Sequence, residues 1–193
     1  GTVMLPKVSR MTRMKQMDAV KRHIRLSMEL VMCMVCAMAF GLAAVAVNFA
    51  PLFYGDDFAY SGTLMMPLAF TLLSIGFANV IRTQWVLPQG RDTIFVHSVL
   101  TGAIINLIAN FVLIPPFGAM GAAAATVLAE FSVPAVQFVY LRKELPYAQY
   151  LKTTGVYCLF GLVMAGVVAL LGYVLPLYGW RKLAVQVIGG AAV

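Results

Sequence analysis

Five long apolar segments, separated by short polar connectors, constrain this chain more than any other feature. They cover residues 26–49, 62–81, 94–114, 118–141 and 153–175, and a sixth begins near Leu183. A helix needs about 20 apolar residues to cross the hydrocarbon core, and each complete segment is close to that length. Only helices and closed barrels satisfy their own backbone polar groups in lipid. The sequence therefore predicts an all-α, polytopic transmembrane helix bundle.

Charged residues are scarce, and most of the cations lie on one side of the predicted bundle. Only 11% of residues are charged, against about 25% in a typical soluble domain, so lipid must surround much of the chain. The net charge of +7 would suit nucleic acid, but the cations lie between the apolar segments, which argues against that partner. Alternate connectors carry twelve of the 14 basic residues, and this bias places their side in the cytoplasm. We therefore expect a multi-pass protein of the inner, or cytoplasmic, membrane.

The polar connectors also suggest three regions. Residues 1–25 are expected to hold the end of a preceding helix and a basic cytoplasmic segment, amphipathic because apolar residues recur every three between Lys7 and Arg25. Residues 26–141 would form four transmembrane helices. Residues 142–193 would form a cytoplasmic connector, a fifth helix and a truncated sixth. Because the chain stops inside an apolar run, we expect it to be part of a longer protein.

Prolines, glycine and aromatic residues predict local features of the bundle. Pro115, Pro116 and Gly118 predict a sharp turn between the third and fourth segments. Alanines at 122–125 then offer a face small enough for close helix approach. Prolines within the second and fourth segments, Pro67 and Pro134, predict kinks. Four aromatic residues at the cytoplasmic ends are expected to form an interfacial belt, namely Trp85, Tyr140, Tyr147 and Tyr150.

A stripe of small and polar residues follows one face of the third segment. Ser98, Gly102, Asn106 and Asn110 are spaced by four residues, so they share a helix face. One interpretation is helix packing, with the asparagine amides hydrogen-bonding between helices. The other is the wall of a polar cavity that hydrogen-bonds sugar hydroxyls. Both interpretations remain open from the sequence.

Glu130 is the one acidic residue deep inside a complete apolar segment. An ionisable group at that depth costs roughly 3 kcal/mol on insertion scales, so something should compensate it. It would either be a proton or cation coupling site, or a protonated carboxyl that hydrogen-bonds a neighbouring helix.

Polar residues also gather where the second segment meets the cytoplasm. Arg82, Gln84 and Arg91 lie there. They would be interfacial anchors whose charged ends reach water. Alternatively, Arg82 would contact a diphosphate, which suits the charge and fork geometry of guanidinium.

The sequence contains no recognisable enzyme motif. It lacks a Gly-x-Ser-x-Gly elbow, a Walker loop and a His-Glu-x-x-His pair, and its acidic residues are too scattered for a paired-carboxylate mechanism. No catalytic residue, cofactor or metal site is therefore predicted. Polar groups inside a membrane bundle favour transport over an enzyme.

Several stretches resemble a known family. FAPLFYGDDF (49–58), QWVLPQGRD (84–92) and NLIANFVLIPPFGAMGAAAATVLAE (106–130) resemble the C-terminal half of bacterial polysaccharide flippases, which belong to the multidrug/oligosaccharidyl-lipid/polysaccharide exporter superfamily. GTVMLPKVSR (1–10) is similar to the end of an earlier helix of the second lobe. The resemblance covers roughly the first 145 residues. It implies one lobe of a two-lobed transporter that flips undecaprenyl-diphosphate-linked oligosaccharide repeat units for capsule or exopolysaccharide biosynthesis.

The placement of these polar residues suggests roles for them. Arg82 would bind the phosphate, Gln84 would be a further substrate-binding residue, Asn106 and Asn110 would bind sugars or pack between helices, and Glu130 would couple transport to an ion. The resemblance suggests the partners. The partners would be the lipid-linked oligosaccharide, membrane lipid and the missing N-terminal lobe, with a polysaccharide polymerase and assembly proteins as further candidates. Two rivals are a cation-coupled multidrug exporter of the same superfamily and a membrane-embedded polysaccharide polymerase or ligase. The second rival would need a large outer loop with catalytic residues, and the outer loops here are short.

Overall fold

The computed structural model describes residues 5–174 and 179–191, and within them the chain is built of helices. Four continuous helical stretches are long and apolar enough to cross a membrane. One of them folds back on itself, so five crossings result, as the apolar segments predicted. The helices are α1 (Leu5–Arg13), α2 (Met17–Tyr54), α3 (Ala59–Ala69), α4 (Thr71–Ile81), α5 (Asp92–Leu141), α6 (Tyr147–Val174) and α7 (Trp180–Ala191), with short helical turns η1 (Asp56–Phe58), η2 (Arg82–Val86) and η3 (Leu87–Gln89). Residues 1–4 and the end of the fifth predicted segment at Leu175 lie outside the described residues.

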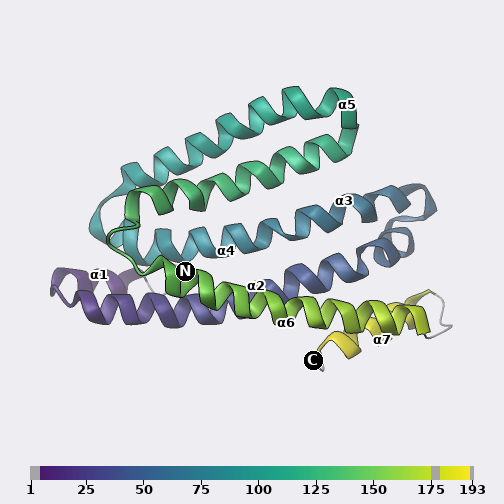
Figure 1. Cartoon of the computed structure of the whole chain (residues 1–193), viewed down its shortest axis with the longest axis horizontal. Coiled ribbons are helices and arrows are strands. Elements are labelled where there is room, and N and C mark those ends of the chain that lie inside the picture. Colours follow the sequence, from purple (N-terminus) through teal and green to yellow (C-terminus); the bar gives the residue numbers. More distant parts are fainter. Residues whose placement is uncertain (1–4, 175–178, 192–193) are drawn as a thin grey trace.

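The crossings run side by side, and their connectors gather at two opposite ends (Figure 1). Helices α3 and α4 lie between the folded α5 and the pair formed by α2 and α6. The start of α2, the η2–η3 turn and the α5–α6 connector share one end, which we call the cytoplasmic end because the predicted cytoplasmic cations belong to it. The η1 turn and the reversal inside α5 share the other end. This arrangement agrees with the alternation predicted from the charges.

Helix α5 is a hairpin of two limbs that meet at Gly118. This glycine has φ 55° and ψ −131°, the one non-helical backbone conformation inside α5, and Phe117 separates it from Pro115 and Pro116. We call residues 92–117 the first limb and residues 119–141 the second limb. A Cβ at Gly121 would lie 2.1 Å from the Leu113 carbonyl oxygen, so the limbs meet backbone to backbone beside the turn. The predicted turn and close approach are confirmed.

The two prolines inside other segments behave differently. Pro67 is followed by a break at Phe70, which separates α3 from α4. There the Phe70 amide donates to the Pro67 carbonyl oxygen over 3.2 Å, and the Thr71 hydroxyl donates to the Leu68 carbonyl over 2.7 Å. At Pro134 the backbone stays helical. Phe70 keeps helical backbone angles (φ −72°, ψ −15°), so the predicted kinks at Pro67 and Pro134 both stay predictions.

The largest buried side chains form a hydrophobic core at the cytoplasmic end. This core corrects the expected aromatic belt, because Trp85, Tyr147 and Tyr150 are each under 5% exposed and pack inside it, whereas Tyr140 is exposed. The basic amphipathic stretch is divided by a turn at Lys15, and its second half is the first part of α2. The apolar face of that stretch packs into the core through Val8, Val20 and Ile24.

Candidate substrate groove

A groove of about 580 Å³ lies between three helical limbs. One wall is α4 with the first residue of η2, and the other two are the first and second limbs of α5. Most of the lining is apolar, with alanine, valine and isoleucine side chains. The polar lining residues are Asn79, Arg82, Asn106, Thr126, Glu130 and Gln137. The groove therefore brings together three of the predicted site residues from three separate limbs.

Arg82 provides the cation of the groove. It opens η2, a π-helical turn, and such turns are frequent at functional sites. Its Nη2 donates to the Asn79 Oδ1 over 2.9 Å, and its guanidinium carbon lies 4.9 Å from the centre of the Phe95 ring. The Nε atom is buried and has no hydrogen-bond partner in the described part of the chain. Arg82 is thus held on two sides at the groove wall, by Asn79 and by Phe95.

The small polar stripe on the first limb divides into a packing part and a groove part. Ser98 is fully buried and donates to the Phe95 carbonyl oxygen. Gly102 faces the second limb, where an added Cβ would lie 3.1 Å from a Val133 methyl carbon. Asn106 lines the groove, and Asn110 donates to its Oδ1 over 3.0 Å along the same helix. Gly102 also lines the groove, and among the described residues neither asparagine hydrogen-bonds another helix, so the predicted interhelical amide bonds are not seen and the sugar contacts stay a prediction.

Glu130 lies on the second limb and lines the groove. Its backbone carbonyl oxygen accepts a hydrogen bond from the Ser74 hydroxyl of α4, which ties these two walls together. Among the described residues its carboxyl group makes no hydrogen bond or ion pair. The neighbouring Thr126 hydroxyl is already used, because it donates to the Ala122 carbonyl oxygen over 3.0 Å. The helix-to-helix contact at this position is therefore made by the backbone, and the carboxyl is left to the groove.

Gln84 was predicted to bind the substrate but does not line the groove, whereas Gln137 lines it and was not predicted. Gln84 is buried, does not line the groove, and has no hydrogen-bond partner for its Oε1 in the described residues. Gln137 lines the groove and is 1% exposed, with an Oε1 that is equally unpartnered. The spacing of seven residues from Glu130, two helical turns, was the sequence signal for Gln137. Asn79 had a comparable signal, three residues before Arg82.

A second groove, of about 860 Å³, lies between α2, α6 and α7. Its lining is largely aliphatic and aromatic, with Met38, Leu72, Phe160 and Met164 among the contributing side chains. At the edge of this groove the Gln186 amide of α7 bridges two helices, accepting from Asn48 of α2 and donating to the Val168 carbonyl of α6, each over 3.3 Å. This groove offers an apolar chain a continuous surface.

Comparison with known proteins identifies a relationship over nearly the whole chain. Residues 1–185 match the family described as lipid II flippase MurJ. Neither a curated protein nor a solved structure matches the chain. The family match and the membrane-spanning helices together place the protein in the inner membrane.

Proposed function

Because the chain belongs to the lipid II flippase MurJ family, whose members flip a lipid-linked precursor, we propose that it flips lipid II from the cytoplasmic to the outer leaflet of the inner membrane. The observation that carries this proposal is the family match over residues 1–185, which includes all three limbs of the groove. The cargo would carry a saccharide on a polyprenyl diphosphate. Transport would make and break no bond, so we assign no catalytic residue.

The groove supplies groups suited to the polar part of this cargo. Arg82 would bind the diphosphate, since a guanidinium presents paired donors to phosphate oxygens. Asn106 and Gln137 have amides at the groove wall, and amides both donate to and accept from sugar hydroxyls. Asn110 would act by orienting Asn106, to which it is hydrogen-bonded.

The apolar groove between α2, α6 and α7 suits the polyprenyl chain of the same cargo. Its walls expose methyl, thioether and ring carbons, against which an isoprenoid chain packs without losing hydrogen bonds. We expect an analogue with a short water-soluble chain to bind the protein more weakly than the full-length lipid. Equal affinity for the two would assign the tail to bulk membrane.

We propose Glu130 as the coupling residue. An ionisable carboxyl at groove depth, with no partner among the described side chains, is the kind of group that binds a proton or cation during transport. Replacing Glu130 with glutamine should leave cargo binding intact and abolish the dependence of flipping on an ion gradient. Unchanged ion dependence would remove Glu130 from the mechanism.

A polysaccharide repeat unit is the second candidate cargo. The stretches 49–58, 84–92 and 106–130 favour it, because they resemble polysaccharide flippases. The two cargoes share the diphosphate and the polyprenyl chain, so the groove chemistry described above applies to both. They differ in the saccharide and in the cell-surface polymer that depends on it.

Depleting the protein in its host separates the two cargoes. We expect lipid II to accumulate in the cytoplasmic leaflet and cells to lyse, with reversal by wild type but not by Arg82→Ala. Arg142→Ala is the matched control, because Arg142 is an exposed cation at the same end and does not line the groove. Accumulated repeat units with normal peptidoglycan would select the second cargo. Accumulation of neither lipid would overturn the proposal.

A further inference from the structure

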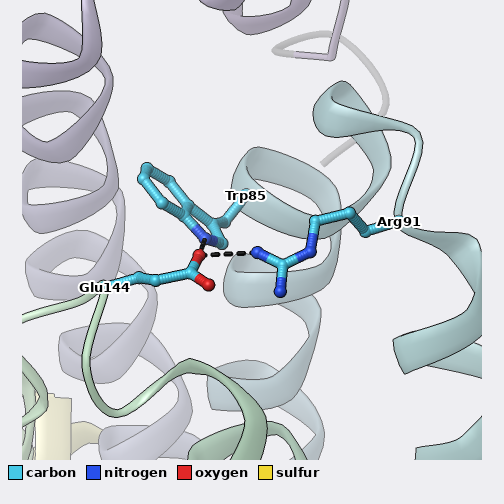
Figure 2. Close-up of polar contacts among 3 residues, drawn as sticks. All are labelled: Trp85, Arg91 and Glu144. Carbon is cyan, nitrogen blue, oxygen red and sulfur yellow. Dashed lines mark hydrogen bonds and ion pairs between the residues drawn. The ribbon is translucent and has the colours of Figure 1, made fainter.

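Outside the groove, two donors converge on a single carboxylate oxygen at the cytoplasmic end (Figure 2). The Trp85 indole Nε1 donates to the Glu144 Oε2 over 3.0 Å, and the Arg91 Nη1 donates to the same oxygen over 2.6 Å. We call Trp85, Arg91 and Glu144 the cytoplasmic clamp. Charge-assisted hydrogen bonds of this kind are roughly twice as strong as neutral ones.

The surroundings keep the Glu144 carboxylate ionised. Burial raises its pKa. The hydrogen bonds from Arg91 and Trp85 and the charges of Arg91 and Lys21 lower that pKa by more than burial raises it. The pKa of Glu144 therefore lies below its ordinary value. Lys21 of α2 also lies 5.9 Å from the centre of the Trp85 ring, which is 3% exposed. The clamp therefore stays charged at neutral pH.

The clamp takes one side chain from the cytoplasmic end of each limb that lines the groove. Trp85 lies in η2, which continues α4. Arg91 immediately precedes the first limb of α5, and Glu144 follows the second limb in the α5–α6 connector. The two bonds to Glu144 thus fix the relative positions of all three groove walls at one end.

The π-helical turn η2 links the clamp to the groove. Arg82 and Trp85 both belong to it, yet Arg82 lines the groove while Trp85 faces the hydrophobic core and Glu144. A π-turn holds one residue more than an α-turn. If it relaxed to α-helical register while the clamp held Trp85, Arg82 would rotate by roughly 100° relative to Trp85, the angle of one residue in an α-helix. By holding Trp85, the clamp keeps η2 in the π-helical register, in which Arg82 faces the groove and Trp85 faces the hydrophobic core.

We infer that Trp85, Arg91 and Glu144 are positioning residues for Arg82, because they hold η2 in the register that presents the Arg82 guanidinium to a lipid-linked diphosphate. This inference rests on the proposed function, since it requires Arg82 to contact the cargo. It extends that function by adding three residues that do not line the groove. The clamp acts through the backbone of η2, so its loss should affect recognition of the diphosphate and spare recognition of the lipid chain.

The test measures binding of two lipids to the purified full-length protein in nanodiscs. Undecaprenyl diphosphate carries the group that Arg82 would bind, and undecaprenol lacks it. We expect Trp85→Phe, which removes the indole N–H and keeps a smaller aromatic ring, and Glu144→Gln each to weaken diphosphate binding roughly tenfold, the effect of a lost charge-assisted hydrogen bond. Undecaprenol binding should not change. The matched control is Glu29→Gln, because Glu29 pairs with Arg25 over 3.0 Å on α2, away from the groove.

A double-mutant cycle separates positioning from general destabilisation. In an Arg82→Ala background, Glu144→Gln should cause no further loss of diphosphate binding, because the residue it positions is gone. Additive losses, or equal losses for both lipids, would overturn the inference, and so would diphosphate binding that Arg82→Ala leaves unchanged. If wild type binds undecaprenyl diphosphate in this pattern but fails to flip lipid II, the proposed cargo is wrong and the positioning role stands.

Discussion

The α5 hairpin should be sensitive to a single methyl group at Gly121. A Cβ there would lie 2.1 Å from the Leu113 carbonyl oxygen, 2.5 Å from its carbonyl carbon and 3.0 Å from the Ile114 nitrogen. All three atoms are backbone, so no side-chain rotation can relieve the contact, and the limbs would have to separate by about 1 Å. Overpacking of this kind costs about 1–3 kcal/mol, and a backbone clash belongs in the upper part of that range.

The assay is thermal unfolding of the full-length protein in detergent. A loss of about 2–3 kcal/mol corresponds to a Tm lower by roughly 4–12 °C for a chain of this size. The control is Gly166→Ala in α6, where an added Cβ meets no atom within 4 Å, and where alanine favours the helix by about 1 kcal/mol. If Gly121→Ala were as stable as Gly166→Ala, the two limbs could not approach as closely as described.

Three further predictions address other contacts. Mild oxidation should join Cys36 of α2 to Cys158 of α6, whose sulfur atoms lie 3.7 Å apart, and mass spectrometry of the peptides should find that bond and none to Cys33. The Glu144 pKa is lowered, so the clamp's contribution to stability should be complete above the ordinary glutamate pKa of about 4.3 and fade as pH falls through the lowered value. The measurement is the difference in Tm between wild type and Glu144→Gln as a function of pH. A difference that vanished near pH 6 would contradict this prediction. Gln186→Leu removes the amide that joins α7 to α2 and α6, so limited proteolysis should release the C-terminal helix faster, and an unchanged rate would mean that apolar packing alone holds α7.

Features that depend on neighbours in sequence could be predicted from the sequence. The spans follow from apolar length, and the α5 reversal follows from prolines beside a glycine that can adopt positive φ. The groove residues Arg82, Asn106 and Glu130 were each predicted singly, because polar groups at that depth are costly and need a reason. That the three meet in one groove depends on how α4 packs against the α5 hairpin, which no local pattern specifies.

The π-helical turn explains why Gln84 was assigned to the site and Trp85 to the membrane interface. Both assignments followed from the position of these residues just beyond the second apolar segment, at the cytoplasmic boundary. The extra residue of the π-turn changes which side chains face the groove, so Gln84 is buried away from it and Trp85 enters the core. The partner of Trp85, Glu144, lies 59 residues further along the chain, and its role depends on a contact that sequence spacing does not encode.

The packing of this bundle differs between its cytoplasmic end and the depth of the membrane, because the solvent differs. At the cytoplasmic end, where water is available, large side chains such as Ile24 and Tyr150 are buried, because removing apolar surface from water stabilises the fold by about 25 cal/mol per Å². In the middle of the apolar segments, small side chains such as Ala39 and Ala125 are buried, because lipid tails are as apolar as the side chains and close packing favours association. The bundle is therefore held most firmly at its cytoplasmic end, where the clamp lies. The groove walls extend from that end on helices held by weaker packing, so the cytoplasmic end is the part best able to fix the position of Arg82.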